Sequence, residues 1–257
     1  MLPTFADWPS KRFSRQAPAW GWGWPCCCGG VTPCVTGCAS IGNELTGTAS
    51  TFSGNECTDC PTSRIFDNFS HAGTASIGGV DPAWFPATSC GATAVTTQIR
   101  GTGSEGQVLN LSGGALLRSL TRPALSGFCL EVRCRLVELT SSGVAGITVP
   151  GGRVFFARPL FGNYGRQACS DANGCIQALE FQTFGTFGAG DTMSIIFRDQ
   201  GAGPTPDNQL TCTVCYLING LIVRQEENVI CCFPNPLLVG LMCTLQADFD
   251  YFEVLTN

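Results

Sequence analysis

Four cysteines near the start of the chain have the spacing of a metal site. Cys34 and Cys38 are separated by three residues and Cys57 and Cys60 by two, with 18 residues between the pairs. Such spacing brings two thiolates of each pair to one ion, so a tetrahedral zinc site with four thiolate ligands fits. Two or three disulfides, with some partners from cysteines 26–28, also fit, and free thiols are a third alternative. In each case we expect a structural role, because this segment has few large apolar side chains and needs a cross-link.

The cysteine content is high for the whole chain, with 17 in 257 residues. The odd number leaves at least one thiol unpaired if every disulfide is intramolecular. Cysteines in strand-like segments are expected to pack in the core as small hydrophobic residues, although oxidation could pair some of them. These are Cys129, Cys134, Cys212, Cys215, Cys231, Cys232 and Cys243.

Residues for hydrolytic chemistry are scarce. His71 is the only histidine, which excludes an HExxH zinc site, and no nucleophile motif accompanies it. Glu180 has no second carboxylate two or four residues away along its predicted strand, as a two-carboxylate glycosidase would need. The sequence therefore favours a protein that is not an enzyme.

Charge and hydropathy exclude several partners. The net charge is −5 with 13% charged residues, so no basic field attracts nucleic acid. No stretch approaches the roughly 20 apolar residues of a membrane span, and the first residues do not have the pattern of a Sec signal peptide. The glycine motif at residues 101–106 matches G-x-G-x-x-G, but a strand pattern follows it, so we interpret it as a turn and not as a dinucleotide site.

From residue 64 onward the pattern is that of short strands joined by turns. In residues 128–138 the apolar side chains alternate with charged ones, which predicts a half-buried antiparallel strand. Asn219-Gly220 between two apolar runs predicts a type I′ hairpin that joins residues 210–218 to residues 221–225. Other strands are expected at residues 94–99, 107–111, 116–120, 144–149, 153–157, 176–184, 192–198 and 237–245.

Two terminal motifs resemble the closing strands of a known fold. Residues 64–70 contain an F-D-x-F motif, and residues 247–257 contain F-D-x-F-x-V. They resemble the first and last strands of concanavalin A-like (laminin G-like) jelly rolls, which lie side by side and seal the sandwich. The resemblance implies an all-β, concanavalin A-like jelly-roll sandwich of two antiparallel sheets with an irregular Cys-rich N-terminal arm. We therefore expect Phe66 and Phe69 in a strand antiparallel to the one that carries Phe249 and Phe252.

The same resemblance implies candidate ligand sites. Jelly rolls of this kind often hold calcium where the terminal strands meet, and Asp67, Asp248 and Asp250 could supply oxygen ligands there. The alternative is that these carboxylates hydrogen-bond to backbone at the strand ends. Candidate sugar-binding aromatic residues, each of which could instead belong to the core, are Trp84, Phe85, Tyr164, Phe184 and Phe187.

The chain divides into residues 1–62, expected to be a Trp/Cys-rich docking arm, and residues 63–257, the jelly-roll domain. The arm holds four tryptophans without helical or strand periodicity, at positions 8, 20, 22 and 24. Exposed indoles are usually buried against a partner, although an extended flexible arm is the alternative. The Cys-rich run of the arm also resembles small uncharacterised proteins of cysteine-rich bacteria and their phages.

Two classes of function fit these observations. The first is a non-enzymatic structural or interaction protein, a subunit or decoration of a virion, phage tail or extracellular appendage, docked through its arm to copies of itself or to other subunits. The second is a carbohydrate-binding (lectin-like) module that recognises surface glycans. The first is favoured because a free-standing lectin has no need of residues 1–62.

Overall fold

The computed structural model describes residues 43–45, 60, 63–70, 83–87, 96–139, 143–149, 153–167, 181–201, 203–204, 209–233 and 235–257. These residues form strands and one short 3-10 helix, η2 (Pro159–Phe161). The strands are β1 (Asn43–Leu45), β2 (Ser63–Asp67), β3 (Trp84–Ala87), β4 (Thr96–Thr102), β5 (Gln107–Leu120), β6 (Cys129–Leu139), β7 (Ala145–Val149), β8 (Arg153–Arg158), β9 (Asn163–Gln167), β10 (Phe181–Phe184), β11 (Thr192–Asp199), β12 (Gln209–Ile218), β13 (Leu221–Cys232) and β14 (Leu237–Thr256).

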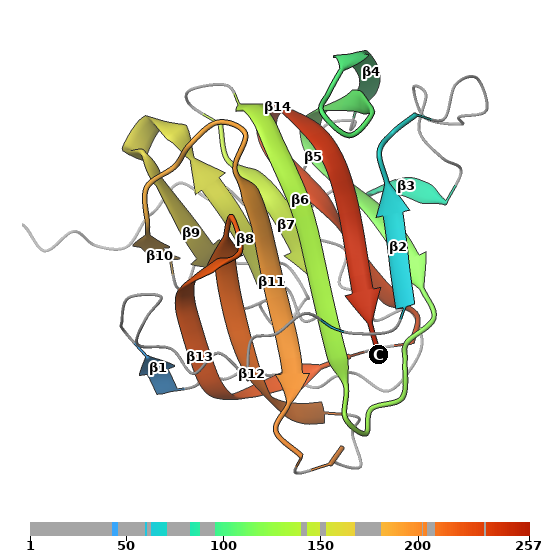
Figure 1. Ribbon diagram of the computed structural model, residues 1–257, viewed down its shortest axis with the longest axis vertical. Helices are drawn as coiled ribbons and strands as arrows, with labels where there is room; N and C mark the ends of the chain where they lie inside the picture. The colour runs from blue at the N-terminus through green and yellow to red at the C-terminus, as the bar shows by residue number, and fades with distance from the viewer. Residues whose placement is uncertain are drawn as a thin grey trace, which may run out of the picture.

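The strands form an antiparallel sheet that curls into two layers (Figure 1). One layer contains β13, β12, β11, β6, the second half of β14, and β2. The other contains β10, β9, β8, β7, the first half of β14, and the second half of β5 with β3 on its far side, while the first half of β5, with β4, continues the first layer. Aromatic rings join the layers, as Phe155 of β8 meets Tyr216 of β12 with ring centroids 5.4 Å apart. The predicted all-β jelly-roll sandwich is therefore confirmed.

The closing strands pair as the terminal motifs predicted. β2 is antiparallel to β14, with Phe66 opposite Glu253. Phe69 is fully buried, but Phe66 is 37% exposed and contacts the Tyr251 ring. The two phenylalanines are three positions apart, so a regular strand places them on opposite faces. Phe69 follows the end of β2 and has a φ of 58°, which starts a new direction for the chain.

Two strands are longer than the sequence predicted. Residues 107–111 and 116–120 belong to one strand, β5, which runs through Gly113 and Gly114. Residues 237–245 are likewise continuous with the terminal strand as β14. Opposite Gly113, β14 carries an extra residue, because Cys243 pairs with Gly114 and Gln246 pairs with Ser112. Such a β-bulge bends a strand without ending it. Glycines at the bend look like a turn in the sequence, so one strand was predicted as two.

Both predicted turns are confirmed. Asn219 and Gly220 have φ values of 52° and 77° between β12 and β13, which pair antiparallel up to Ile218 and Leu221. Residues 103–106 connect β4 to β5, and the Gly103 N–H donates to the Gly106 carbonyl at 2.6 Å. The glycine motif is therefore the end of a hairpin.

Cysteines divide according to the face on which they lie. Cys134, Cys212, Cys231 and Cys243 are buried in the main core, as predicted. Burial raises the pKa of Cys243 to about 11, so its thiol stays protonated near neutral pH. Cys60 and Cys129 instead form a disulfide outside the main core, and Cys215, on the same face, is also disulfide-bonded. Cys129 and Cys215 are buried as expected, but in a second apolar cluster on the other face of the sheet, and their oxidation is the alternative that the sequence left open.

Other predictions fall on residues that the structure does not describe. These include most of the docking arm, so its role and the boundary at residue 62 remain predictions. No helix in the described ranges has the length and apolar character needed to cross a membrane.

Replacing Cys60 and Cys129 together with alanine should lower the free energy of unfolding by roughly 2–4 kcal/mol, because the bond joins residues separated by 69 positions and restrains the unfolded chain. Urea unfolding of the wild type and the double variant measures the difference. With reductant present, the two proteins should unfold at the same midpoint. Equal midpoints without reductant would show that the bond does not stabilise the fold.

Candidate functional site

A row of polar side chains crosses four neighbouring strands. Gln98 of β4 lies opposite Asn110 of β5, Asn110 lies opposite Asp248 of β14, and Asp248 lies opposite Glu138 of β6. Residues directly opposite one another in antiparallel strands point to the same face of the sheet. Positions far apart in the sequence therefore meet on one surface.

Irregular pairing on both sides of this row shapes the surface. The bulge before Gln246 separates it from the regular pairing of the first half of β14. On the other side, Asp248 pairs with Glu138 but the next residue, Phe249, pairs with Leu136, so β6 carries an extra residue. Bulges occur frequently next to binding and active sites, where they change the direction of a side chain.

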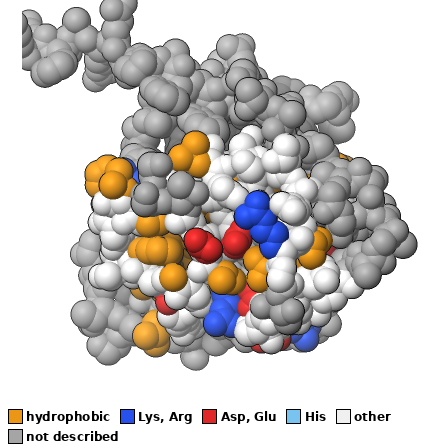
Figure 2. All heavy atoms as spheres, turned by 90° about the horizontal axis from the view of Figure 1, so that it is seen from above, with side chains coloured by type: hydrophobic (Ala, Val, Ile, Leu, Met, Phe, Trp, Pro, Cys, Tyr) orange, Lys and Arg blue, Asp and Glu red, His pale blue; other side chains and the backbone are white. Residues whose placement is uncertain are grey.

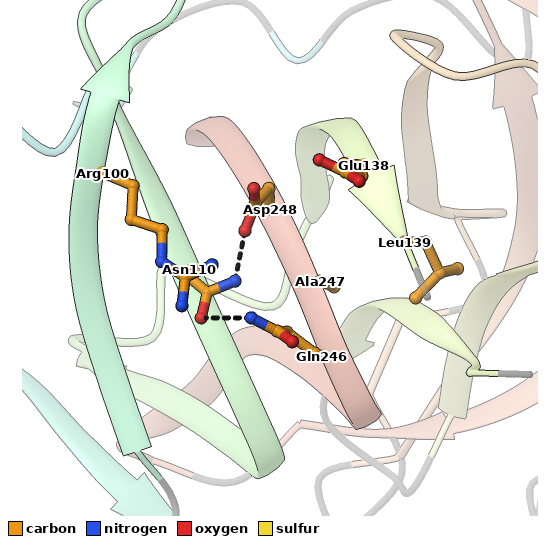
Figure 3. Close-up of a pocket in the computed structure, with 7 residues that line it drawn as sticks. All are labelled: Arg100, Asn110, Glu138, Leu139, Gln246, Ala247 and Asp248. Carbon is orange, nitrogen blue, oxygen red and sulfur yellow. Dashed lines mark hydrogen bonds between the residues drawn. The ribbon is translucent and has the colours of Figure 1, made fainter. Parts of the chain in front are cut away.

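Three members of this row, Asn110, Asp248 and Glu138, line a solvent-open pocket of about 160 Å³. Figure 3 shows Arg100 reaching toward it from β4 and Glu138 standing on β6, with Gln246 and Asp248 of β14 between them. Asn110, Leu139 and Ala247 complete the lining. Seen from above, the molecule presents acidic and basic side chains next to one another, with hydrophobic side chains beside them (Figure 2).

Asn110 holds the pocket network together. Its side chain is 5% exposed, and its Nδ2 donates to Asp248 Oδ1. Gln246 Nε2 donates to Asn110 Oδ1 at 3.1 Å. Rotating the Gln246 amide by half a turn instead places its oxygen 3.0 and 3.2 Å from Arg100 Nη1 and Nη2. Either orientation fixes the amide at the centre of the pocket.

The charged groups of the pocket are separated from one another. Arg100 Nε donates to Gln98 Oε1 at 3.1 Å, on the β4 side. Glu138 is exposed on the β6 side, and no salt bridge joins it, Asp248 or Arg100 to another side chain among the described residues. All three can therefore contact a ligand.

The other predicted oxygen ligands have structural partners. Asp67 accepts from the Phe69 N–H at 2.8 Å and from Trp84 Nε1 at 2.7 Å. Asp250 accepts from the Ser104 N–H at 3.1 Å and holds the β4–β5 turn. Within the described ranges, no three His, Cys, Asp or Glu side chains are grouped to hold a metal. Asp67, Asp248 and Asp250 thus have separate roles, and calcium binding remains a prediction from the resemblance.

The predicted zinc ligands are not brought together in the described part of the chain. The sulfur of Cys60 is bonded to Cys129, so it is not a thiolate ligand here and has a different role from the predicted one. Cys34, Cys38 and Cys57 lie outside the described residues.

The candidate aromatic residues do not line the pocket. Trp84 and Tyr164 are buried in the core and Phe187 packs against it. For these three residues the alternative prediction, a place in the core, is confirmed. Phe85 is 37% exposed on β3. Phe184 is in β10, where its side chain is not described, and His71 and Glu180 lie outside the described residues.

Comparisons with known proteins found similarity to this chain only in its fold. No protein-family model matches the chain. No curated protein matches its sequence. One similar solved structure comes from work on the endo-acting O-glycanases that prominent members of the human gut microbiota express to initiate mucin breakdown. It is 15% identical to this chain and has a TM-score of 0.41. The match covers 74% of this chain and 98% of that one.

Two further similar structures concern carbohydrates. The carbohydrate recognition domain of Emp46p, in a metal-free form, is 9% identical, covers 67% of this chain and 88% of its own, and has a TM-score of 0.40. A GH43 glycoside hydrolase is 14% identical, covers 77% of this chain and 42% of its own, and has a TM-score of 0.47. The strand pairings define an all-β jelly-roll sandwich, and these likenesses concern the fold alone.

The expectation that the protein is not an enzyme is corrected by this comparison. Structures named for endo-acting O-glycanases and for a glycoside hydrolase share the fold, so the fold does not exclude enzymatic function. The sequence-based prediction considered only carboxylates on the same strand as Glu180. The pocket instead takes Glu138 and Asp248 from two paired strands, a combination that spacing within a single strand does not reveal.

Replacing Asn110 with alanine should lower the free energy of unfolding by about 1–2 kcal/mol, because the change removes the partner of Asp248 and Gln246 at a buried position. Gln98→Ala, in the same row but exposed, should change it by no more than about 0.5 kcal/mol. Chemical denaturation measures both. Equally small effects would mean that the network does not organise this region.

Proposed function

We propose that the pocket between β4, β5, β14 and β6 binds a carbohydrate. The observation that carries the proposal is the convergence of Arg100, Asn110, Glu138, Gln246 and Asp248 on one solvent-open cavity. Sugar hydroxyls both donate and accept hydrogen bonds. Carboxylates accept, a guanidinium donates, and amides do both, so this set of side chains complements a group of hydroxyls.

The dimensions of the pocket limit what enters it. Its volume of about 160 Å³ is below the roughly 300–1,000 Å³ of pockets that enclose drug-sized ligands. One sugar ring at a chain end fits this space better than an enclosed oligosaccharide. Leu139 supplies apolar lining, and Leu245, which is 47% exposed, precedes Gln246 on β14. Apolar side chains beside polar ones suit the C–H surface of a sugar ring.

Replacing Arg100 with alanine should weaken glycan binding roughly 10- to 100-fold, because a hydrogen bond to a charged group contributes about 1.5–3 kcal/mol. Binding is first located on a glycan array and then measured by calorimetry. Arg64→Ala, which removes an exposed arginine from β2, is the matched control and should leave the affinity unchanged. An array without a binder, or equal losses in both variants, would overturn the proposal.

Glycoside hydrolysis is a second candidate function, supported by the direct opposition of Glu138 and Asp248. Opposite residues in antiparallel strands have Cβ atoms about 4.5–5.5 Å apart. Retaining glycosidases hold their two carboxyl groups about 5–5.5 Å apart and use one as nucleophile and the other as acid and base. Retention is therefore the outcome expected if the two carboxyl groups stand as close together as the paired Cβ atoms do, and inversion if they lie about 6.5–9.5 Å apart.

If the pair hydrolyses the bound glycan, the wild type should release new reducing ends with retained anomeric configuration. Asp248→Asn should slow this release by at least about 100-fold, because it removes a charged group that acts on the reacting bond. Chromatography and NMR of the products measure both. Binding without any product would leave carbohydrate recognition as the function of the pocket.

Attachment to a virion, phage tail or extracellular appendage remains a prediction from the sequence. It depends on residues 1–42 and 46–59, which lie outside the described residues. A carbohydrate-binding pocket on the sandwich is compatible with it.

A further inference from the structure

Glu138 and Asp248 are like charges at directly paired positions of the sheet. They lie directly opposite each other on β6 and β14, and like charges in that position destabilise a sheet. Elsewhere on β6 the charges are compensated, since Arg133 Nη2 donates to Glu131 Oε2 at 3.0 Å and Arg133 Nη1 donates to Glu253 Oε2 at 3.4 Å. Among the described residues, Glu138 is therefore the charged side chain of β6 that has no opposite charge beside it.

The one basic group of the pocket does not compensate the pair. Arg100 is held by Gln98 on the β4 side, and its terminal nitrogens face the Gln246 amide. Figure 3 shows Arg100 and Glu138 on opposite sides of the pocket. The pocket thus has an acidic end and a basic end, with one more negative than positive charge among its lining residues.

We propose that this pocket selects glycans that carry a free, protonated amine, namely hexosamine units without an N-acetyl group. The inference rests on the proposed carbohydrate-binding function. The ammonium group lies between the Glu138 and Asp248 carboxylates, and ring hydroxyls meet Asn110, Gln246 and Arg100. The positive charge offsets the repulsion between the two carboxylates, and each N–H donates a charge-assisted hydrogen bond.

Other charged ligands fit the acidic end of the pocket less well than a sugar ammonium. A uronic acid would add a third carboxylate beside Glu138 and Asp248. Calcium takes six to eight oxygen ligands, whereas this end of the pocket offers two carboxylates. A sugar ammonium needs only a few acceptors and brings its own hydroxyls.

Three β-1,4-linked tetrasaccharides that differ at C2 test the inference: one of glucosamine, one of N-acetylglucosamine and one of glucose. Calorimetry below neutral pH, where the amine is protonated, should show the wild type binding the glucosamine chain roughly 10- to 100-fold more tightly than the glucose chain. Glu138→Gln should lose most of this preference for the glucosamine chain over the glucose chain. Glu105→Gln, the same change in the exposed β4–β5 turn, should keep the preference.

Each other outcome has a distinct meaning. Equal affinity of the wild type for the three chains would overturn the amine preference and leave carbohydrate binding intact. An equal preference in wild type and Glu138→Gln would place the amine elsewhere and also overturn the inference. A preference that depends on added calcium and disappears with chelator would replace the ammonium with a metal. No binding of any chain, together with an empty glycan array, would overturn the proposed function as well.

Discussion

The architecture depends on the hydrogen bonding of the twenty-residue strand β14. Its first half pairs with β5 and β7, and its second half with β5, then β6 and β2. One strand therefore belongs to both layers, and its backbone groups remain paired because the partners change as it bends. The bulge between Cys243 and Gln246 makes the bend. The pocket lies just beyond it, so the same irregularity that closes the sandwich also turns Gln246 and Asp248 toward solvent.

The fold was largely predictable because its main signals are local. Alternation along residues 128–138 identified β6, and Asn219-Gly220 identified the β12–β13 hairpin. The paired aromatic motifs identified the contact between β2 and β14. Strands β1, β3 and β9 were missed because they are short and carry no clear alternation; β3 even contains Pro86, which suits a strand that pairs only with β5.

The candidate site was hardly predictable, for a physical reason. Of its lining residues only Asp248 was singled out from the sequence, and for a calcium site instead of this pocket. Asn110, Glu138 and Gln246 look like ordinary outward-facing strand residues until the register between strands is known. Register is set by pairing between distant segments and by bulges that add single residues. The signal that was available is the excess of polar outward residues near both ends of the predicted terminal strand.

The central claim, that the polar side chains between Arg100 and Glu138 line a carbohydrate-binding pocket, is tested most directly by mapping a bound glycan onto the chain. Backbone amide chemical shifts recorded during titration with the glucosamine tetrasaccharide would locate the contact. The account predicts perturbations concentrated at residues 98–100, 110, 138–139 and 246–248. Perturbations centred instead on the outer face around Arg64, Tyr251 and Glu253, with the pocket residues unchanged, would contradict it.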